Sequence, residues 1–295
     1  MEKKTYVKTV DDFRKIDLEF FRYNGGEGPT VLFTAGLHGD EATGIYVAHK
    51  LIEYLDQNPL ERGTVKILPV ANQTAFRRMK RTSPYDKEDM NRIFPGNKEV
   101  GPTKTIAHYI WEEAEETDYI VDLHCCGVRG SSYTLTVWQE YGFAKELAEM
   151  IDIPQIVQSG GTRGQLFTEA CAHDIPAVII ELPGGGERGV IDIEAGNKCY
   201  QALLNMLRQL EMLAGEGYQP DPLFCDQLEL VVTDRNGAFV PLVEPGQLVE
   251  EGTTLGRIGE KEYTAPKDGV VIKVRDHSFL FKGTFLALIA PTLSE

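Results

Sequence analysis

Short apolar runs alternate with longer segments of helical periodicity along the first two-thirds of the chain. The strand-like runs are residues 30–35, 65–70, 119–123, 133–138 and 177–180. The helix-like segments are residues 41–57, 101–117, 141–150, 165–173 and 189–213. Alternation of this kind is typical of an α/β domain whose sheet is largely parallel. We therefore expect residues 1–213 to form one such domain.

The composition changes at residues 214–222, where glycine and proline cluster as they do in linkers. Beyond this segment, short apolar pieces are separated by turn sequences such as Asn236-Gly237 and Pro245-Gly246. This spacing is typical of strands joined by tight turns. We expect residues 223–295 to form a small all-β domain.

The overall composition excludes several classes of protein. The net charge of -15 argues against a nucleic-acid partner, because phosphates would be repelled. No stretch approaches the 18 apolar residues of a membrane span, and the charged N-terminus has no apolar core of a signal peptide behind it. Five scattered cysteines do not resemble a disulfide framework. We therefore expect a cytoplasmic protein with reduced thiols and no membrane partner.

His38 and Glu41 directly follow the apolar run at residues 30–35, with Gly36 and Gly39 on either side of the histidine. Glycine allows a tight turn at this point. An imidazole and a carboxylate are two of the three protein ligands that a catalytic zinc requires. A pair at this spacing is, taken alone, more typical of solvated surface residues.

Two further polar residues follow apolar runs: His124 after residues 119–123, and Glu181 after residues 177–180. Ligands of open α/β sheets bind beyond the carboxyl ends of the strands. If these strands are parallel neighbours, His38, Glu41 and His124 form a zinc ligand set, and Glu181 fits a general base. The alternative is that each is an ordinary loop residue. Asp122 is either a hydrogen-bond partner of His124 or a buried structural carboxylate.

A basic cluster spans residues 77–81, and Asn91 and Arg92 follow it. Guanidinium groups bind carboxylates in a bidentate manner and can stabilise an oxyanion. In so acidic a chain, a local group of cations indicates an anionic substrate. The alternative is a solvated basic loop.

Four ordered motifs resemble one known family: GLHGDE at 36–41, NRIFPG at 91–96, DLH at 122–124 and the strand end at Glu181. The chain resembles the succinylglutamate desuccinylase/aspartoacylase family, a branch of the zinc carboxypeptidase (M14-like) superfamily, over roughly residues 30–190. The resemblance implies a carboxypeptidase-like three-layer α/β/α domain with a mixed sheet. It also implies one Zn²⁺ per chain and hydrolysis of the amide bond of an N-acyl amino acid.

The resemblance assigns roles to single residues. It implies that His38, Glu41 and His124 bind zinc and that Glu181 is the catalytic base. It implies that Asn91 and Arg92 bind a carboxylate of the substrate. It implies that Arg81 polarises the scissile carbonyl, with Arg77 and Arg78 as alternatives. It also implies that Arg163 contacts the substrate. For Arg163 the alternative is a loop held by glycines at the start of a helix.

Segments 243–258 and 265–271 resemble the pattern of lipoyl/biotinyl-like β-barrels. Lys261 lies near the position that carries the cofactor in such proteins. The segment from Lys261 to Pro266 is short and no Met-Lys pair is present, so we expect an unmodified barrel. Deacylases of the family that act on N-acetylated diamino acids resemble this arrangement. We expect this domain to cover the active-site mouth or to mediate assembly into a homo-oligomer.

The leading hypothesis is a zinc-dependent amidohydrolase that removes the N-acyl group from a small acidic or diamino acid. A metallocarboxypeptidase acting on peptides is the enzymatic alternative. It needs an open groove, whereas a deacylase needs a closed pocket, and the sequence leaves both open. The non-enzymatic alternative is a carrier or binding protein built on the barrel around Lys261.

Overall fold

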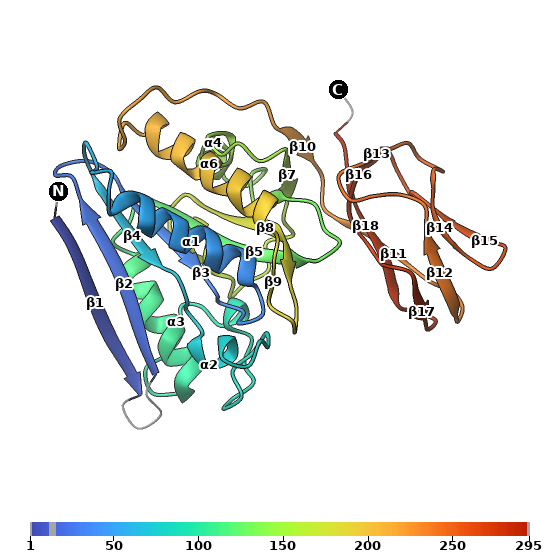
Figure 1. Ribbon diagram of the computed structural model, residues 1–295, viewed down its shortest axis with the longest axis horizontal. Helices are drawn as coiled ribbons and strands as arrows, with labels where there is room; N and C mark the ends of the chain where they lie inside the picture. Colours follow the sequence, from blue (N-terminus) through green and yellow to red (C-terminus); the bar gives the residue numbers. More distant parts are fainter. Residues whose placement is uncertain (1, 12–15, 294–295) are drawn as a thin grey trace.

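The computed structural model describes residues 2–11 and 16–293, and a ten-stranded mixed sheet dominates this part of the chain. The strand order is β1-β2-β4-β3-β5-β8-β6-β7-β10, with β9 paired to β8 (Figure 1). The strands are β1 Glu2–Asp11, β2 Ile16–Asn24, β3 Thr30–Ala35, β4 Thr64–Leu68, β5 Tyr119–Gly127, β6 Tyr133–Thr136, β7 Gln155–Gln158, β8 Ala177–Gly185, β9 Val190–Ile191 and β10 Leu223–Cys225.

The centre of the sheet is parallel and its borders are mixed. β4, β3, β5 and β8 are parallel neighbours. β1 pairs with β2, β2 with β4 and β6 with β8 in antiparallel fashion. The mixed sheet of the predicted fold class is thus confirmed.

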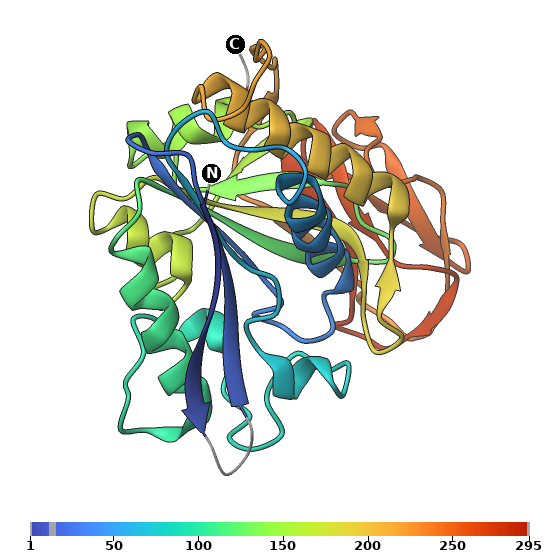
Figure 2. The same ribbon diagram turned by 60° about the vertical axis from the view of Figure 1, so that its left-hand side comes forward.

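Helices cover both faces of the sheet (Figure 2). α1 (Ala42–Leu55) and α6 (Ile193–Gln209) lie on one face, and α3 (Gly101–Ala114) lies on the other. The shorter helices are α2 Gln73–Phe76, α4 Gly142–Glu149, α5 Leu166–Cys171 and a 3-10 helix at Met90–Arg92. Nowhere in the described residues is a helix both long and apolar enough for a membrane span.

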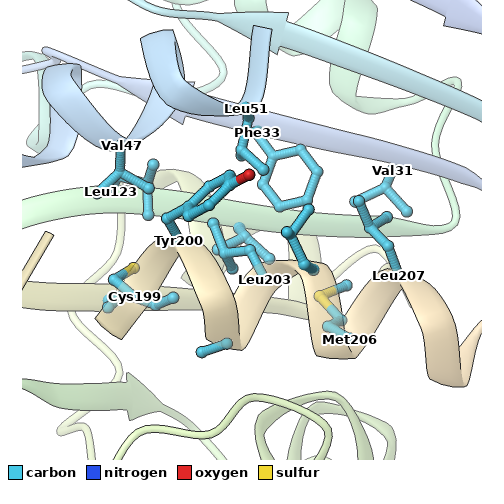
Figure 3. Packing of buried hydrophobic residues seen from close by; sticks show 14 of the residues in the cluster. Val31, Phe33, Val47, Leu51, Leu123, Cys199, Tyr200, Leu203, Met206 and Leu207 are labelled. Atoms are coloured by element: carbon cyan, nitrogen blue, oxygen red, sulfur yellow. The ribbon is translucent and has the colours of Figure 1, made fainter. Parts of the chain in front are cut away.

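Strand β3 is buried on both of its faces, which explains its continuously apolar sequence. Val31 and Phe33 pack toward α1 and α6, whereas Leu32 belongs to the core on the opposite face. Figure 3 shows Leu51 of α1 beside Phe33, and Leu207 of α6 beside Val31. A strand buried on both faces needs an apolar side chain at every position, as parallel sheets with helices on both sides generally do.

Several boundaries differ from the predicted ones. β5 extends to Gly127 and β8 to Gly185, so that His124 and Glu181 lie within strands and not after them. The predicted helix at 189–213 begins only at Ile193, because residues 190–191 form the short strand β9 against β8. Asp192 caps that helix by accepting a hydrogen bond from the Ala195 N–H.

The C-terminal part contains two four-stranded antiparallel sheets, in the orders β11-β18-β16-β13 and β15-β14-β12-β17. Their strands are β11 Glu229–Val232, β12 Gly237–Pro241, β13 Leu248–Val249, β14 Thr254–Ile258, β15 Lys261–Thr264, β16 Gly269–Val274, β17 Ser278–Leu280 and β18 Phe285–Pro291. Phe239, Leu255 and Leu286 are buried between these sheets. The predicted small all-β unit is confirmed. Lys261 begins β15 and is exposed.

The two parts of the chain are joined by more than the linker. β10, which follows the linker, pairs with β7 of the large sheet. The Ser131 N–H, in the segment after β5, donates to the Ile272 carbonyl oxygen at 2.8 Å. Tyr133 and Val157 share an apolar cluster with Ile272 of β16. The division at residues 213 and 223 stays a prediction, but the small sheets pack directly against the ends of β5 and β6.

Leu51 tests how far stability depends on the core between α1, α6 and β3. Its side chain is fully buried, so Leu51→Ala removes apolar contacts and leaves a cavity. We expect the free energy of unfolding to fall by about 2–5 kcal/mol. Urea unfolding followed by circular dichroism measures this change. Glu53→Ala, at an exposed position of the same helix, is the control, and equal midpoints for the two variants would contradict the expectation.

Candidate metal centre

The carboxyl ends of three adjacent parallel strands bring the predicted residues together. His38 and Glu41 follow β3, His124 lies on β5 and Glu181 lies on β8. His124 and Glu181 are register partners across β5 and β8. All four side chains line one cavity of about 170 Å³. The convergence expected from the sequence is therefore present.

His38, Glu41 and His124 form a compact buried triad. One potential ligand atom from each residue lies within 4.8 Å of the others. Glu41 stands between the two imidazoles: its Oε1 is 2.8 Å from His38 Nδ1 and its Oε2 is 2.8 Å from His124 Nδ1. The Cys125 N–H also donates to Glu41 Oε2, at 3.1 Å. The carboxylate is thereby fixed in orientation by three groups.

The turn that carries His38 depends on two glycines. Gly36 has a φ of +66°, in the left-handed region that glycine adopts without steric strain. A Cβ at Gly39 would lie 2.1 Å from the Ala75 carbonyl carbon, so the chain passes α2 at a distance that no side chain permits. Glu41 then occupies the N-cap position of α1.

The outer nitrogen of each imidazole is held by another carboxylate. His124 Nε2 lies 2.7 Å from Asp122 Oδ2, and Asp122 Oδ1 accepts a hydrogen bond from Thr34 Oγ1 at 2.6 Å. His38 Nε2 lies 3.0 Å from Asp89 Oδ1. Carboxylates in this position orient metal-binding histidines and raise their basicity. Of the two readings of Asp122, the hydrogen-bond partner of His124 is the one present.

The triad has the chemistry of a metal site. A neutral imidazole carries one proton, so it cannot donate to carboxylates at both of its nitrogens. His38 and His124 each face two carboxylates, and the arrangement therefore requires an added positive charge, either a proton or a metal cation. Burial lowers the pKa of His124, but Asp122 and Glu41 outweigh it and raise that pKa well above its usual value. Two imidazoles and one carboxylate fit a catalytic metal such as zinc.

Glu181 is not part of the triad, and its environment differs from that of Glu41. Glu181 Oε2 is buried and has no hydrogen-bond partner among the described residues. Burial, followed by the neighbouring charge of Glu41, raises the pKa of Glu181 to about 7. Burial acts on Glu41 in the same direction, but His124 and His38 lower the pKa of Glu41 below its usual value. The pKa values of these two carboxyl groups are therefore shifted in opposite directions, although both groups line one cavity.

Arg81 is the arginine of the basic cluster that reaches this cavity. Its Nη2 donates to Asp89 Oδ2 at 2.8 Å, and its Nη1 lies 3.6 Å from Glu41 Oε1. Arg77 instead contacts Gln73, and Arg78 lines only the neighbouring surface groove, which Arg81 also borders. The geometry thus separates the three candidates, although the role of Arg81 in carbonyl polarisation stays a prediction.

Asn91 and Arg92 line the cavity, whereas Arg163 does not. Asn91 Oδ1 accepts a hydrogen bond from the Leu166 N–H at 3.0 Å, so its amide N–H groups are what it can offer a ligand. The Arg163 guanidinium binds Glu169 through contacts of 2.7 and 2.6 Å, and its side chain is 74% exposed. The structure thus leaves Arg163 outside the group, and its part in substrate binding stays a prediction.

Other cavity residues received no functional role from the sequence. They are Cys125, Cys126, Tyr133, Leu135, Gln165, Ile179, Lys273 and Leu288. Lys273 and Leu288 come from β16 and β18 of the C-terminal sheets. No local motif surrounds Lys273 or Leu288, and their approach to His124 depends on how the two parts of the chain pack. Asp89 could have been found, because it stands two residues before the NRIFPG motif that begins at Asn91.

Metal binding should depend on the triad. His38→Ala removes one of three ligands, so we expect bound divalent metal to fall far below the wild-type content. Plasma mass spectrometry on dialysed protein measures the metal-to-protein ratio. His108→Ala, on helix α3 and outside the cavity, is the matched control and should retain the wild-type content. A full metal equivalent in His38→Ala would show that the triad is not the site.

Known proteins share this sequence pattern and this fold. The N-alpha-acetyl-L-2,4-diaminobutyric acid deacetylase of Halomonas elongata is 28% identical over 291 residues, which cover 92% of this chain and 84% of that protein. The succinylglutamate desuccinylase of Pseudomonas aeruginosa is 28% identical over 233 residues, 70% of this chain and 65% of that protein. A succinylglutamate desuccinylase/aspartoacylase structure from Rhodobacter sphaeroides matches with a TM-score of 0.82 at 23% identity, covering 99% of this chain and 96% of that one.

The family model described as "Succinylglutamate desuccinylase/Aspartoacylase catalytic domain" matches residues 27–209. This segment is more than half of the chain and contains the triad, Glu181 and the arginines of the cavity. The chain therefore belongs to the succinylglutamate desuccinylase/aspartoacylase family.

Proposed function

We propose that this protein is a zinc-dependent hydrolase that cleaves the amide bond of a small N-acyl amino acid. The observation that carries this proposal is the buried triad of His38, Glu41 and His124 with the Glu181 carboxylate in the same cavity. The names of the relatives from Halomonas and Pseudomonas, a deacetylase and a desuccinylase, support the same reaction class.

The size of the cavity favours a deacylase over a carboxypeptidase. Its volume is about 170 Å³, below the roughly 300–1,000 Å³ of ordinary ligand pockets. Lys273 and Leu288 of the C-terminal sheets form part of its wall. A peptide substrate needs an open groove along which its chain can extend, whereas an acyl amino acid fits a short enclosed site.

The triad would hold the metal, and Glu181 would move the proton. A zinc ion bound by His38, Glu41 and His124 supplies Lewis acidity at the scissile carbonyl. Glu181, whose Oε2 lacks a partner in the described residues, takes a proton from the attacking water. The same carboxyl group then delivers this proton to the leaving amine nitrogen. The second proton of the water also passes to the amine, so the products are a carboxylate and an ammonium group.

The cationic and amide groups at the other side of the cavity would bind the substrate. Arg81 provides positive charge near the carbonyl oxygen as that oxygen becomes negative, and Asp89 holds the guanidinium in place. Asn91 and Arg92 offer N–H donors for the carboxylate of the amino acid. Each of these residues acts by charge or by hydrogen bonding, and none needs to change its covalent state.

Glu181→Ala separates catalysis from metal binding. It removes the proposed base and leaves the ligands, so we expect kcat to fall by about 10²–10⁴-fold at unchanged metal content. Steady-state kinetics and metal analysis on the same preparation give both values. Glu194→Ala, at an exposed position of α6, should behave like the wild type. Near-wild-type turnover in Glu181→Ala would exclude this mechanism.

A substrate screen distinguishes the two enzymatic hypotheses. We expect the metal-loaded protein to release amino acids from N-acetyl, N-succinyl or N-formyl amino acids and to leave short peptides intact. A chelator should abolish this release and added zinc should restore it, because the Lewis acid is required. Amine release assayed by chromatography measures both. Trimming of peptides from the C-terminus without deacylation would favour the carboxypeptidase.

A further inference from the structure

We propose that the Tyr133 hydroxyl is a further catalytic group, whose oxygen accepts the N–H of the scissile amide and so turns the nitrogen lone pair toward Glu181. The inference deepens the proposed function and rests on it. Three observations carry it: the position of Tyr133 opposite Glu181 in the sheet, a buried hydroxyl without a partner, and the chemistry of the other polar groups of the cavity.

Tyr133 lies directly opposite Glu181 in the sheet. It begins β6, which pairs with β8 in antiparallel fashion, and the two residues are register partners. Opposed side chains of an antiparallel pair project from the same face, with Cβ atoms roughly 4.5–5.5 Å apart. Both side chains line the metal-site cavity. The phenol is therefore the immediate cross-strand neighbour of the proposed base.

The order of the strands gives an order of functional groups. Along this part of the sheet, β3, β5, β8 and β6 are consecutive neighbours. They place the triad at the ends of β3 and β5, Glu181 on β8, and Tyr133 beyond it on β6. Arg81 lies on the triad side, 3.6 Å from Glu41 Oε1. A substrate whose carbonyl oxygen is held at the triad and Arg81, with its nitrogen at Glu181, thus brings its N–H toward the phenol.

An apolar layer underlies Tyr133 and Glu181. Leu135 and Ile179 are register partners in the same two strands, and both line the cavity. Because side chains alternate along a strand, these two residues share the face of Tyr133 and Glu181. They offer no hydrogen-bond donor or acceptor. A polar substrate atom that contacts these four side chains therefore depends on Glu181 or Tyr133 for its hydrogen bond.

The Tyr133 hydroxyl is buried without a partner. The residue is 5% exposed, and its hydroxyl forms no hydrogen bond with the part of the chain that the structure describes. The hydroxyl oxygen is not fully enclosed, in contrast to Glu181 Oε2, so it faces the space of the cavity. Buried tyrosine hydroxyls usually find a hydrogen-bond partner, and an unmade bond is unfavourable. A bound substrate group would supply the missing partner.

The environment keeps this hydroxyl neutral. Burial, followed by the charge of Glu181, raises the pKa of Tyr133 well above its usual value. A neutral phenol can both donate and accept a hydrogen bond. It can therefore accept an amide N–H without adding a further negative charge to a cavity that already contains two carboxyl groups, Glu41 and Glu181.

The other neutral acceptors of the cavity fit this role less well. Asn91 Oδ1 already accepts the Leu166 N–H. Gln165 directly precedes Leu166 in the chain and therefore lies with Asn91, at the proposed site of the substrate carboxylate. Tyr133 is the neutral acceptor that stands beside Glu181.

The hydrogen bond acts on the geometry of the nitrogen. In the planar amide, the nitrogen lone pair is delocalised into the carbonyl group. Once water has added to the carbonyl carbon, that lone pair is localised and can accept a proton. An N–H held by Tyr133 leaves the lone pair directed at the neighbouring carboxyl group. Glu181 delivers its proton there, the C–N bond breaks, and the original N–H stays on the leaving amine.

The test uses Tyr133→Phe, which keeps the ring and removes the hydroxyl, as full-length, metal-loaded protein. Three substrates are compared: the N-acyl amino acid that the wild type hydrolyses fastest, its N-methyl analogue, and its O-acyl analogue, in which an ester oxygen replaces the amide nitrogen. We expect kcat/KM for the N–H amide to fall about 10- to 100-fold. The values for the N-methyl amide and the ester should change less than about threefold, because neither has an N–H to bind.

Tyr119→Phe, at the start of β5 and outside the cavity, is the matched control and should equal the wild type on all three substrates. Metal content and thermal unfolding, measured on the same preparations, should be alike in the three proteins.

An equal loss on all three substrates, or no loss on the N–H amide, would overturn the inference. If the wild type hydrolyses N-acyl amino acids and Tyr133→Phe does so equally well, the proposed function stands and only the role of Tyr133 fails. If the wild type hydrolyses none of them, the proposed function fails and the role of Tyr133 fails with it.

Discussion

The Glu41 carboxylate holds two imidazoles together, with each of its oxygens 2.8 Å from one Nδ1. Most other features of the site follow from this shared contact. It requires the His38 turn and the His124 strand to end at the same edge, which the parallel pairing of β3 and β5 provides. It also leaves the outer nitrogens to Asp89 and Asp122. Each imidazole therefore lies between Glu41 and a second carboxylate. This arrangement is stable only with an added positive charge, which is the physical basis for assigning a metal.

The sequence predicted the centre of the fold and of the site because both depend on local patterns. Buried parallel strands such as β3 are apolar at every position, and a polar residue such as His124 stands out at the end of such a run. The border strand β1 lacks that signal, because its side chains alternate between exposed and half-buried positions. The end of β8 was misplaced because β9 pairs with its last residues, a contact that no local pattern reveals.

The pairing of individual cations with nearby carboxylates explains what the sequence could not supply at the site. The sequence alone does not distinguish Arg81 from Arg77 and Arg78. In the structure, the hydrogen bond from Arg81 to Asp89 distinguishes it from the other two. Arg163 has the residue type of a substrate ligand, yet its guanidinium donates two hydrogen bonds, from Nε and Nη2, to the Glu169 carboxylate. Each outcome depends on which carboxylate lies nearby in space. Residue types in order can indicate a reaction class, but the assignment of individual cations requires the packed structure.

Strand β16 contains a β-bulge at Ile272, because its pairing with β18 shifts between Val271 and Lys273. The bulge lets Val271 and Val274 both face the core of the C-terminal sheets while Lys273, between them, lines the cavity that holds the triad. An insertion or deletion elsewhere in β16 would shift this pairing and change which side chains of the C-terminal sheets line the cavity, while His38, Glu41, His124 and Glu181 stay in place. The composition of the cavity wall on this side therefore depends on how β16 pairs with β18.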